Sequence, residues 1–191
     1  MNIKENINSK IFSAIEYIEE ELNKTNLLNY FEDYQNEPGY YKNKKGIYAL
    51  YLKNKDCLKD YKNTNIYNKH LSKLDKLNEI LKETNANKMD LFYIGETCDD
   101  FETRVIKKHF QGKYTTVNRK LYSYLKDCKS KDFKSASKEE VKNYTDWFNK
   151  NFEVRFYPIE NGQYTDITIK VLETVLISMY NPPLNTKDCK D

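Results

Sequence analysis

Five side chains in this sequence are of types that could together cut a phosphodiester bond. Two tyrosines lie in strand-like runs, Gly-Ile-Tyr and Tyr-Ile-Gly, and an arginine, a histidine and an isolated glutamate follow: Tyr48, Tyr93, Arg104, His109 and Glu173. Phosphodiester hydrolysis needs a Lewis acid, a water nucleophile and positive charge at the phosphate. A carboxylate that holds Mg²⁺, a tyrosine or histidine that activates water, and an arginine would meet these needs.

Glu173 lies in the apolar run from Val171 to Ile177, which has the pattern of a helix. An ionised carboxylate in such a place costs roughly several kcal/mol unless it is paired or binds a cation. Mg²⁺ takes oxygen ligands and often uses only one or two protein carboxylates, so Glu173 is a candidate metal ligand. A structural ion pair with a nearby arginine is the alternative, and this feature alone favours the ion pair.

Arg104 comes nine residues after Gly95, early in a predicted helix, and Lys108 and His109 follow it. On an α-helix, residues four apart share a face, and a residue five positions on lies at the edge of that face. Arg104 could grip a phosphate through two hydrogen bonds, and His109 could act as a general base. Ordinary surface positions are the alternative for both residues, and packing within a sheet is the alternative for the two tyrosines.

Local sequence patterns predict the elements that must position these residues. The runs 46–52, 91–95 and 152–157 are rich in β-branched and aromatic residues and predict three strands, the last ended by Pro158. Apolar residues recur at helical spacing within the polar stretch 53–90, which predicts a helical insertion between the first two strands. Further helices are predicted at 6–30, from about 101 past 109 with Asp99 or Asp100 as N-cap, at 117–125, at 139–149, and from Thr165 or Asp166 to 179.

The chain has 191 residues, of which 39% are hydrophobic, so it can fill the core of one domain. Residues 1–40 hold 3 Lys and 8 Asp or Glu, a net charge of −5, whereas residues 102–134 hold 10 Lys or Arg and 3 Asp or Glu, a net charge of +7. This asymmetry predicts a basic face that could meet a polyanion, with a solvated helix surface as an equal alternative.

Composition also bears on compartment and domain organisation. The longest apolar stretch, 171–180, is too short to span a membrane. The four cysteines form no CxxC pair and the N-terminus has no signal peptide, so we expect reduced thiols in the cytoplasm. A Glu-Pro-Gly break at 37–39 divides the chain into an N-terminal amphipathic helical extension, 1–40, and a main domain, 41–191, that contains the insertion 53–90.

Taken together, these motifs resemble the GIY-YIG nuclease superfamily. The resemblance covers most of the chain and rests on Gly46-Ile47-Tyr48, Tyr93-Ile94-Gly95, Arg104, His109, Glu173 and the ending Asn181-Pro182-Pro183-Leu184-Asn185. Any one triplet is a weak signal, whereas the ordered set is fairly specific.

The resemblance implies an α+β fold in which a small three-stranded antiparallel sheet is flanked by helices. It implies a metal-dependent DNA endonuclease, a hydrolase in which Glu173 holds a single Mg²⁺, for which Mn²⁺ can substitute. Arg104 would contact the scissile phosphate. One of Tyr48 and Tyr93, together with His109, would help to deprotonate the attacking water.

The resemblance also implies supporting residues and partners. Gly95, Lys108 and Asn185 would support the site, and the substrate would be double-stranded DNA cut by a stand-alone, restriction-type or mobile-element enzyme. A homodimer is a further expectation, because cutting both strands often needs two active sites. The basic stretch offers five candidate DNA contacts: Lys107, Lys108, Lys113, Arg119 and Lys120.

Three features depart from the usual family pattern. Tyr48 and Tyr93 are 45 positions apart, where the gap is often far shorter; the spacing from Arg104 to His109 is five rather than four; and Glu96 follows Tyr-Ile-Gly where Lys, Gln or Ser is commoner. Because of this spacing, either Lys108 takes the role of His109, or the helix contains an irregular turn that brings His109 into place.

A non-catalytic binding module that kept the fold is therefore a second hypothesis. A regulatory protein whose acidic N-terminal helix binds a partner or blocks the groove is a third.

Overall fold

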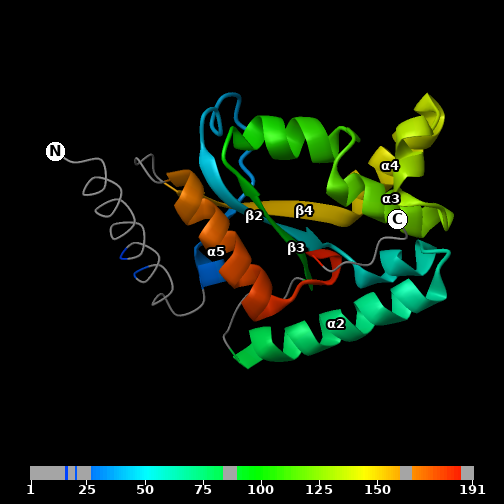
Figure 1. The fold of residues 1–191 in the computed structure, drawn as a ribbon, viewed down its shortest axis with the longest axis horizontal. Helices are drawn as coiled ribbons and strands as arrows, with labels where there is room; N and C mark the ends of the chain where they lie inside the picture. The colour runs from blue at the N-terminus through cyan, green and yellow to red at the C-terminus, as the bar shows by residue number, and fades with distance from the viewer. Residues whose placement is uncertain (1–15, 17–19, 21–26, 84–89, 160–164, 186–191) are drawn as a thin grey trace, which may run out of the picture.

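The computed structural model describes residues 16, 20, 27–83, 90–159 and 165–185. In this part of the chain, an open four-stranded antiparallel sheet has helices packed on both faces (Figure 1). The strand order is β1-β4-β2-β3, so β3 and β1 are the two edges. No helix among the described residues is long and apolar enough to cross a membrane.

Strand β2 (Lys45–Leu52) is the centre of the sheet. It pairs along its whole length with β4 (Phe152–Ile159) on one side and with β3 (Asp90–Thr97) on the other. Strand β1 (Glu32–Asp33) adds two residues to the outer edge of β4. Because β2 is covered on both faces, its sequence is a nearly continuous apolar run rather than an alternating one.

The two faces of the sheet have separate hydrophobic cores. Ile47, Ala49 and Tyr51 of β2 pack with α5 (Thr165–Tyr180), whereas Tyr48 and Leu50 face the opposite core. The remaining helices are η1 (Leu27–Tyr30), η2 (Lys55–Asp60), α2 (Thr64–Glu83), η3 (Glu102–Phe110), α3 (Thr116–Lys126), η4 (Ser130–Ser135), α4 (Lys138–Asn151) and η5 (Pro183–Asn185). The short stretch from η1 to β1 belongs to the same body, because Leu27, Leu28 and Phe31 are buried with α5.

Two sequence predictions about the sheet are wrong. The sheet has four strands rather than three, because β1 is only two exposed acidic residues long and carries no alternating pattern. Pro158 does not end β4, which continues to Ile159. Pro158 lies opposite Gly46 of β2, and a proline is tolerated in a strand where its missing N–H is not needed by the neighbour.

The helix predictions are largely confirmed, with one change of type. The insertion forms η2 and α2, and α2 contributes His70, Leu74 and Leu77 to the protein core, so it is more than an outlying appendage. The helix after β3 is a π-helix over Glu102–Phe110. Of the predicted helix 6–30, Glu16 and Glu20 are helical and exposed and 27–30 form η1; the rest lies outside the described residues.

A substitution at Gly46 tests whether close packing between β2 and β4 stabilises the sheet. A Cβ atom at this position would collide with the carbonyl oxygen of Tyr157 in β4 and would lie 3.1 Å from the backbone nitrogen of Ile159. We therefore expect Gly46→Ala to lower the free energy of unfolding by about 2 kcal/mol or more, because backbone atoms of the central pair cannot move aside cheaply. Urea unfolding followed by circular dichroism measures this change.

Gly39 supplies the matched control. It also has a positive φ, +81°, but nothing lies within 4 Å of a Cβ atom built there. Gly39→Ala should lose only about 1 kcal/mol from the left-handed backbone conformation. Equal losses in the two variants would contradict the steric role of Gly46.

Candidate active site

The two motif tyrosines lie side by side over Gly95. Tyr48 of β2 is directly opposite Gly95 of β3, and Tyr93 is two residues earlier on the same face. The centroids of the two tyrosine rings are 6.0 Å apart. A Cβ atom on Gly95 would lie 2.6 Å from the phenolic oxygen of Tyr48 and 2.7 Å from the Tyr93 ring. Only glycine therefore leaves room for both phenols at this point.

His109, which lies on η3, contacts the buried side chain of Tyr48. Its Nε2 lies 2.8 Å from Tyr48 Oη, and its Nδ1 lies 3.0 Å from Thr115 Oγ1. His109 is 2% exposed. Burial lowers the pKa of His109 to about 3, and the positive charges of Arg104 and Lys108 act in the same direction. The imidazole is therefore neutral near pH 7 and can accept a proton or a hydrogen bond.

The π-helical form of η3 explains how His109 reaches this position. Hydrogen bonds in a π-helix join residue i to i+5, so side chains five apart share a face. At the end of the element, the backbone N–H of Lys113 donates to the carbonyl of Lys108 across five residues, at 2.8 Å. The spacing of five between Arg104 and His109 therefore suits η3, and His109, not Lys108, contacts Tyr48.

Asn118, which is fully buried, fixes the end of η3. Its side-chain amide donates to three backbone carbonyl oxygens at 2.8–3.2 Å, those of Lys108, His109 and Lys113. Tyr144 Oη donates to Asn118 Oδ1 at 2.9 Å, and the backbone N–H of Asn118 donates to Thr115 Oγ1 at 3.1 Å. These bonds satisfy carbonyl groups that a helix end otherwise leaves without partners, and they hold the His109 backbone in place.

The outer edge of β3 carries the other half of the site. Asn185 Oδ1 accepts the backbone N–H of Ile94 at 2.9 Å, and Asn185 Nδ2 donates to the Ile94 carbonyl at 2.8 Å. Two residues further along β3, Glu96 lies close enough to Glu173 for its charge to raise the pKa of the Glu173 carboxyl. Asn185 thus docks on the outward-facing backbone groups of Ile94 in β3.

Glu173 has an unusual electrostatic setting. Burial and, to a smaller extent, the nearby carboxylate of Glu96 raise its pKa to about 7, and Arg104 opposes this rise. The two phenols are also perturbed. The pKa of Tyr93 is raised to about 12 and that of Tyr48 well above its usual value, mainly by burial. The charge of Glu173 adds to the rise in both pKa values, and the charge of Arg104 opposes it. Tyr48, Tyr93 and His109 are therefore in contact, and Arg104 and Glu173 lie within electrostatic range of them.

The donor set fits a divalent cation held by few protein ligands. Among the described residues, no cluster of three or more His, Cys, Asp or Glu side chains could hold a metal ion. Mg²⁺ commonly uses one or two carboxylates and completes its shell with waters and phosphate oxygens. Glu173, with Glu96 beside it, matches that pattern, and a cation there would relieve the repulsion between two adjacent carboxylates.

The predicted DNA contacts do not all lie on the surface. Lys113 is exposed, Lys107 pairs with Glu102 at 3.0 Å, and Arg119 lies 5.2 Å from the ring centroid of Tyr114. Lys120 is only 9% exposed and its Nζ donates to the Leu184 carbonyl at 3.1 Å. The expectation that Lys120 meets DNA is therefore wrong: its ammonium group anchors the segment that leads to Asn185.

Thr115 and Asn118 were not among the predicted site residues. A usable signal was present for Thr115, because it lies two residues before the predicted helix 117–125 and threonine is a favoured N-cap residue. Thr115 does cap α3. Nothing in the sequence indicated that the same hydroxyl would also contact His109, since that contact depends on the turn between η3 and α3.

Comparison with known proteins agrees with this geometry. A family model described as the GIY-YIG catalytic domain matches residues 46–191. Neither the curated proteins nor the solved structures compared with this chain include a match.

His109 should make the stability of the protein depend on pH. Its pKa is 6.5 in an ordinary setting and about 3 in the folded site, so between these values the unfolded chain binds one more proton than the folded chain. The free energy of unfolding should therefore fall as the pH drops below 6.5, with His109 contributing up to about 1.4 kcal/mol per pH unit. Urea unfolding at a series of pH values measures the slope.

His109→Gln is the control, because it removes this titration and leaves all other groups. Its slope below pH 6.5 should be shallower than that of the wild type. Identical slopes would mean that His109 binds a proton as readily in the folded protein as in the unfolded chain, and would contradict the expected fall in its pKa.

Proposed function

Because the chain belongs to the family of GIY-YIG catalytic domains, we propose that it is a metal-dependent endonuclease that hydrolyses phosphodiester bonds in double-stranded DNA. The observation that carries this proposal is the 2.8 Å contact between Tyr48 and a neutral His109, with Arg104 and Glu173 acting on the same phenol. This arrangement combines a proton acceptor, a cation and a carboxylate around the phenol of Tyr48.

Glu173 is the residue that would hold the divalent cation, Mg²⁺ or Mn²⁺, with Glu96 as its neighbour. The bound cation would supply Lewis-acid polarisation of the phosphate and lower the pKa of a coordinated water. Arg104 would grip a phosphate oxygen and offset the charge that develops there during attack.

Tyr48 and His109 would move the proton of the attacking water. The high pKa of Tyr48 argues against a resting phenolate. In the proposed step, Tyr48 Oη takes a proton from the water while its own proton passes to His109 Nε2, so no free phenolate forms. Arg104 and Lys108 oppose protonation of His109 in the empty site. A bound phosphate would offset both positive charges and make His109 a better acceptor.

The DNA itself would meet the exposed and partly exposed cations on and after η3. Lys107, Lys108, Lys113 and Arg119 are our proposed backbone contacts, and such contacts give affinity without reading sequence. Two copies acting together would cut both strands, so we also propose a homodimer during cleavage.

A binding module with little or no cleavage is the second candidate. It is favoured by one observation, the position of Glu96 beside Glu173. A second negative charge at this point opposes the approach of a phosphate unless a cation offsets it.

Plasmid cleavage in Mg²⁺ or Mn²⁺ tests the proposal. We expect the wild type to nick or linearise plasmid, and Glu173→Gln to abolish cleavage because it removes the cation's carboxylate. Arg104→Lys should slow cleavage about 10²-fold or more, because lysine cannot reproduce the two-pronged grip on phosphate. Gel electrophoresis of the products measures the rates.

Glu139→Gln is the matched control, since Glu139 is exposed on α4 and should cut at the wild-type rate. Equal rates for wild type and Glu173→Gln would refute the catalytic assignment. Metal-dependent DNA binding by the wild type without any cleavage would instead support the binding module.

A further inference from the structure

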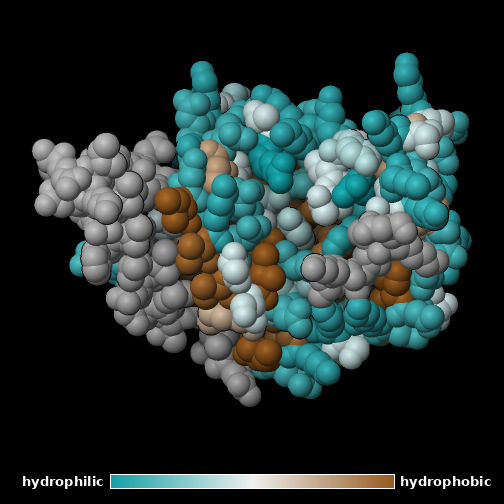
Figure 2. Space-filling view, in the orientation of Figure 1, coloured by the Kyte–Doolittle hydropathy of each residue, from teal (hydrophilic) through white to brown (hydrophobic). Residues whose placement is uncertain are grey.

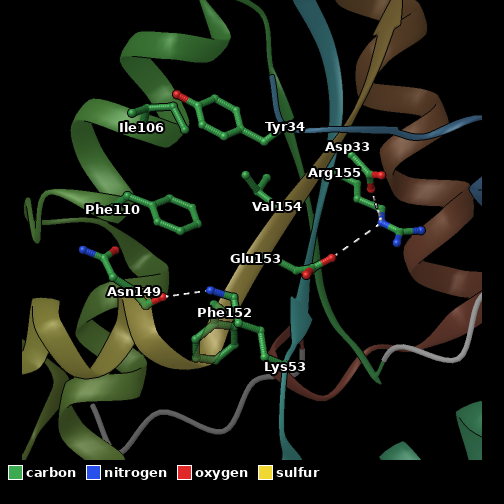
Figure 3. Close-up of a pocket in the computed structure, with 10 residues that line it drawn as sticks. All are labelled: Asp33, Tyr34, Lys53, Ile106, Phe110, Asn149, Phe152, Glu153, Val154 and Arg155. Carbon is green, nitrogen blue, oxygen red and sulfur yellow. Dashed lines mark hydrogen bonds and ion pairs between the residues drawn. The ribbon is translucent and has the colours of Figure 1, made fainter. Parts of the chain in front are cut away.

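A pocket of about 520 Å³ opens at the edge of the sheet opposite to the candidate active site (Figure 3). It lies beside β4, and none of the candidate catalytic residues, which come from β2, β3, η3 and α5, lines it. Its volume is within the range of pockets that bind small molecules or inserted side chains. An inference about this pocket does not depend on the proposed nuclease activity.

The interior of the pocket is apolar and comes from separate parts of the chain. Ile106 and Phe110 of η3, Val154 of β4 and Tyr34 after β1 surround the open space in Figure 3. The ring of Phe110 packs against Phe148 of α4 at a centroid distance of 5.0 Å. The Phe110 side chain that lines the pocket is thus held in place by packing against the protein core.

The charged residues around the pocket have partners within the protein. Arg155 pairs with Asp33 at 3.0 Å and with Glu153 at 3.7 Å, and Lys53 Nζ donates to the Asn149 carbonyl at 3.1 Å. Two acidic and two basic side chains line the pocket, so they cancel in net charge. This rim has no surplus of positive charge to attract a phosphate, and it favours a neutral ligand.

The pocket runs along a part of the sheet edge that lacks a strand partner. Strand β1 pairs with Arg155 and Phe156 only, whereas β2 pairs with β4 from Phe152 to Ile159. Among the residues that the structure describes, no strand pairs with Phe152–Val154 on the outer side. Backbone groups along an open strand edge can pair with an added strand, and neighbouring pockets then select its side chains.

We propose that this pocket binds an extended peptide segment of a partner protein, which lengthens the sheet along the outer edge of β4 at Val154, since the backbone N–H of Phe152 already donates to the Phe148 carbonyl. One apolar side chain of the peptide would enter the space between Ile106, Phe110 and Tyr34. The next residue of the peptide, pointing to the opposite face of the sheet, would lie beside Glu153 and Arg155. The ligand class is therefore a neutral strand that alternates apolar and polar residues.

Trp147 offers a direct measurement of binding, because it is the only tryptophan in the chain and its ring packs on the pocket residue Phe152 at 5.8 Å. The probe is a pool of blocked hexapeptides in which valine or phenylalanine alternates with threonine. We expect saturable changes in Trp147 fluorescence and in the amide NMR signals of β4. The same peptides methylated on alternate backbone nitrogens should bind about tenfold more weakly or worse, because they cannot donate the strand hydrogen bonds.

Ile106→Gln should weaken peptide binding by a similar factor, whereas Ile80→Gln should not, since Ile80 is 46% exposed on α2 and does not line the pocket. Circular dichroism would show that both variants fold. If benzyl alcohol or the methylated peptides bind as tightly as the parent peptides, the site takes an apolar group without strand pairing and the proposal is wrong. If no peptide changes either signal, it is wrong as well.

Discussion

The hydrogen bond between Tyr48 and His109 is the contact on which the rest of the site depends. It joins the central strand to the helical layer through a single buried pair of atoms. Tyr48 can be there only because Gly95 leaves space on the neighbouring strand. His109 can be there only because η3 is wound as a π-helix and because Thr115 and Asn118 hold its end. The cost of burying these polar groups is offset by their satisfaction in one connected network.

The edge strand β3 has a different task. Its inner side pairs with β2, and the backbone N–H and carbonyl of Ile94 on its outer side bind the side chain of Asn185. The late segment of the chain therefore docks on the main chain of β3 rather than on its side chains. A main-chain contact of this kind can hold Asn185 whatever side chain the strand carries at that position.

The sequence was sufficient for much of this arrangement. The strands at 46–52 and 91–95 and the helix that bears Glu173 follow from apolar patterns that tertiary packing reinforces. The prediction failed where local signals are short or depend on context. Strand β1 has two residues, Pro158 is accommodated by its place opposite Gly46, and the burial of Lys120 depends on a distant carbonyl. The π-helix could be anticipated only as an irregular turn, because its cause lies in contacts that Asn118 and Tyr48 make from other elements.

The docking of Asn185 on β3 has a consequence for the behaviour of the protein in a crowded solution. An open strand edge is a template on which another chain can add, and proteins commonly block such edges to avoid aggregation. Asn185 occupies both outward backbone groups of Ile94. The same side chain that we predict to support the candidate site thus also covers part of the outer edge of β3. A variant without the Asn185 side chain would expose these backbone groups and become more prone to self-association.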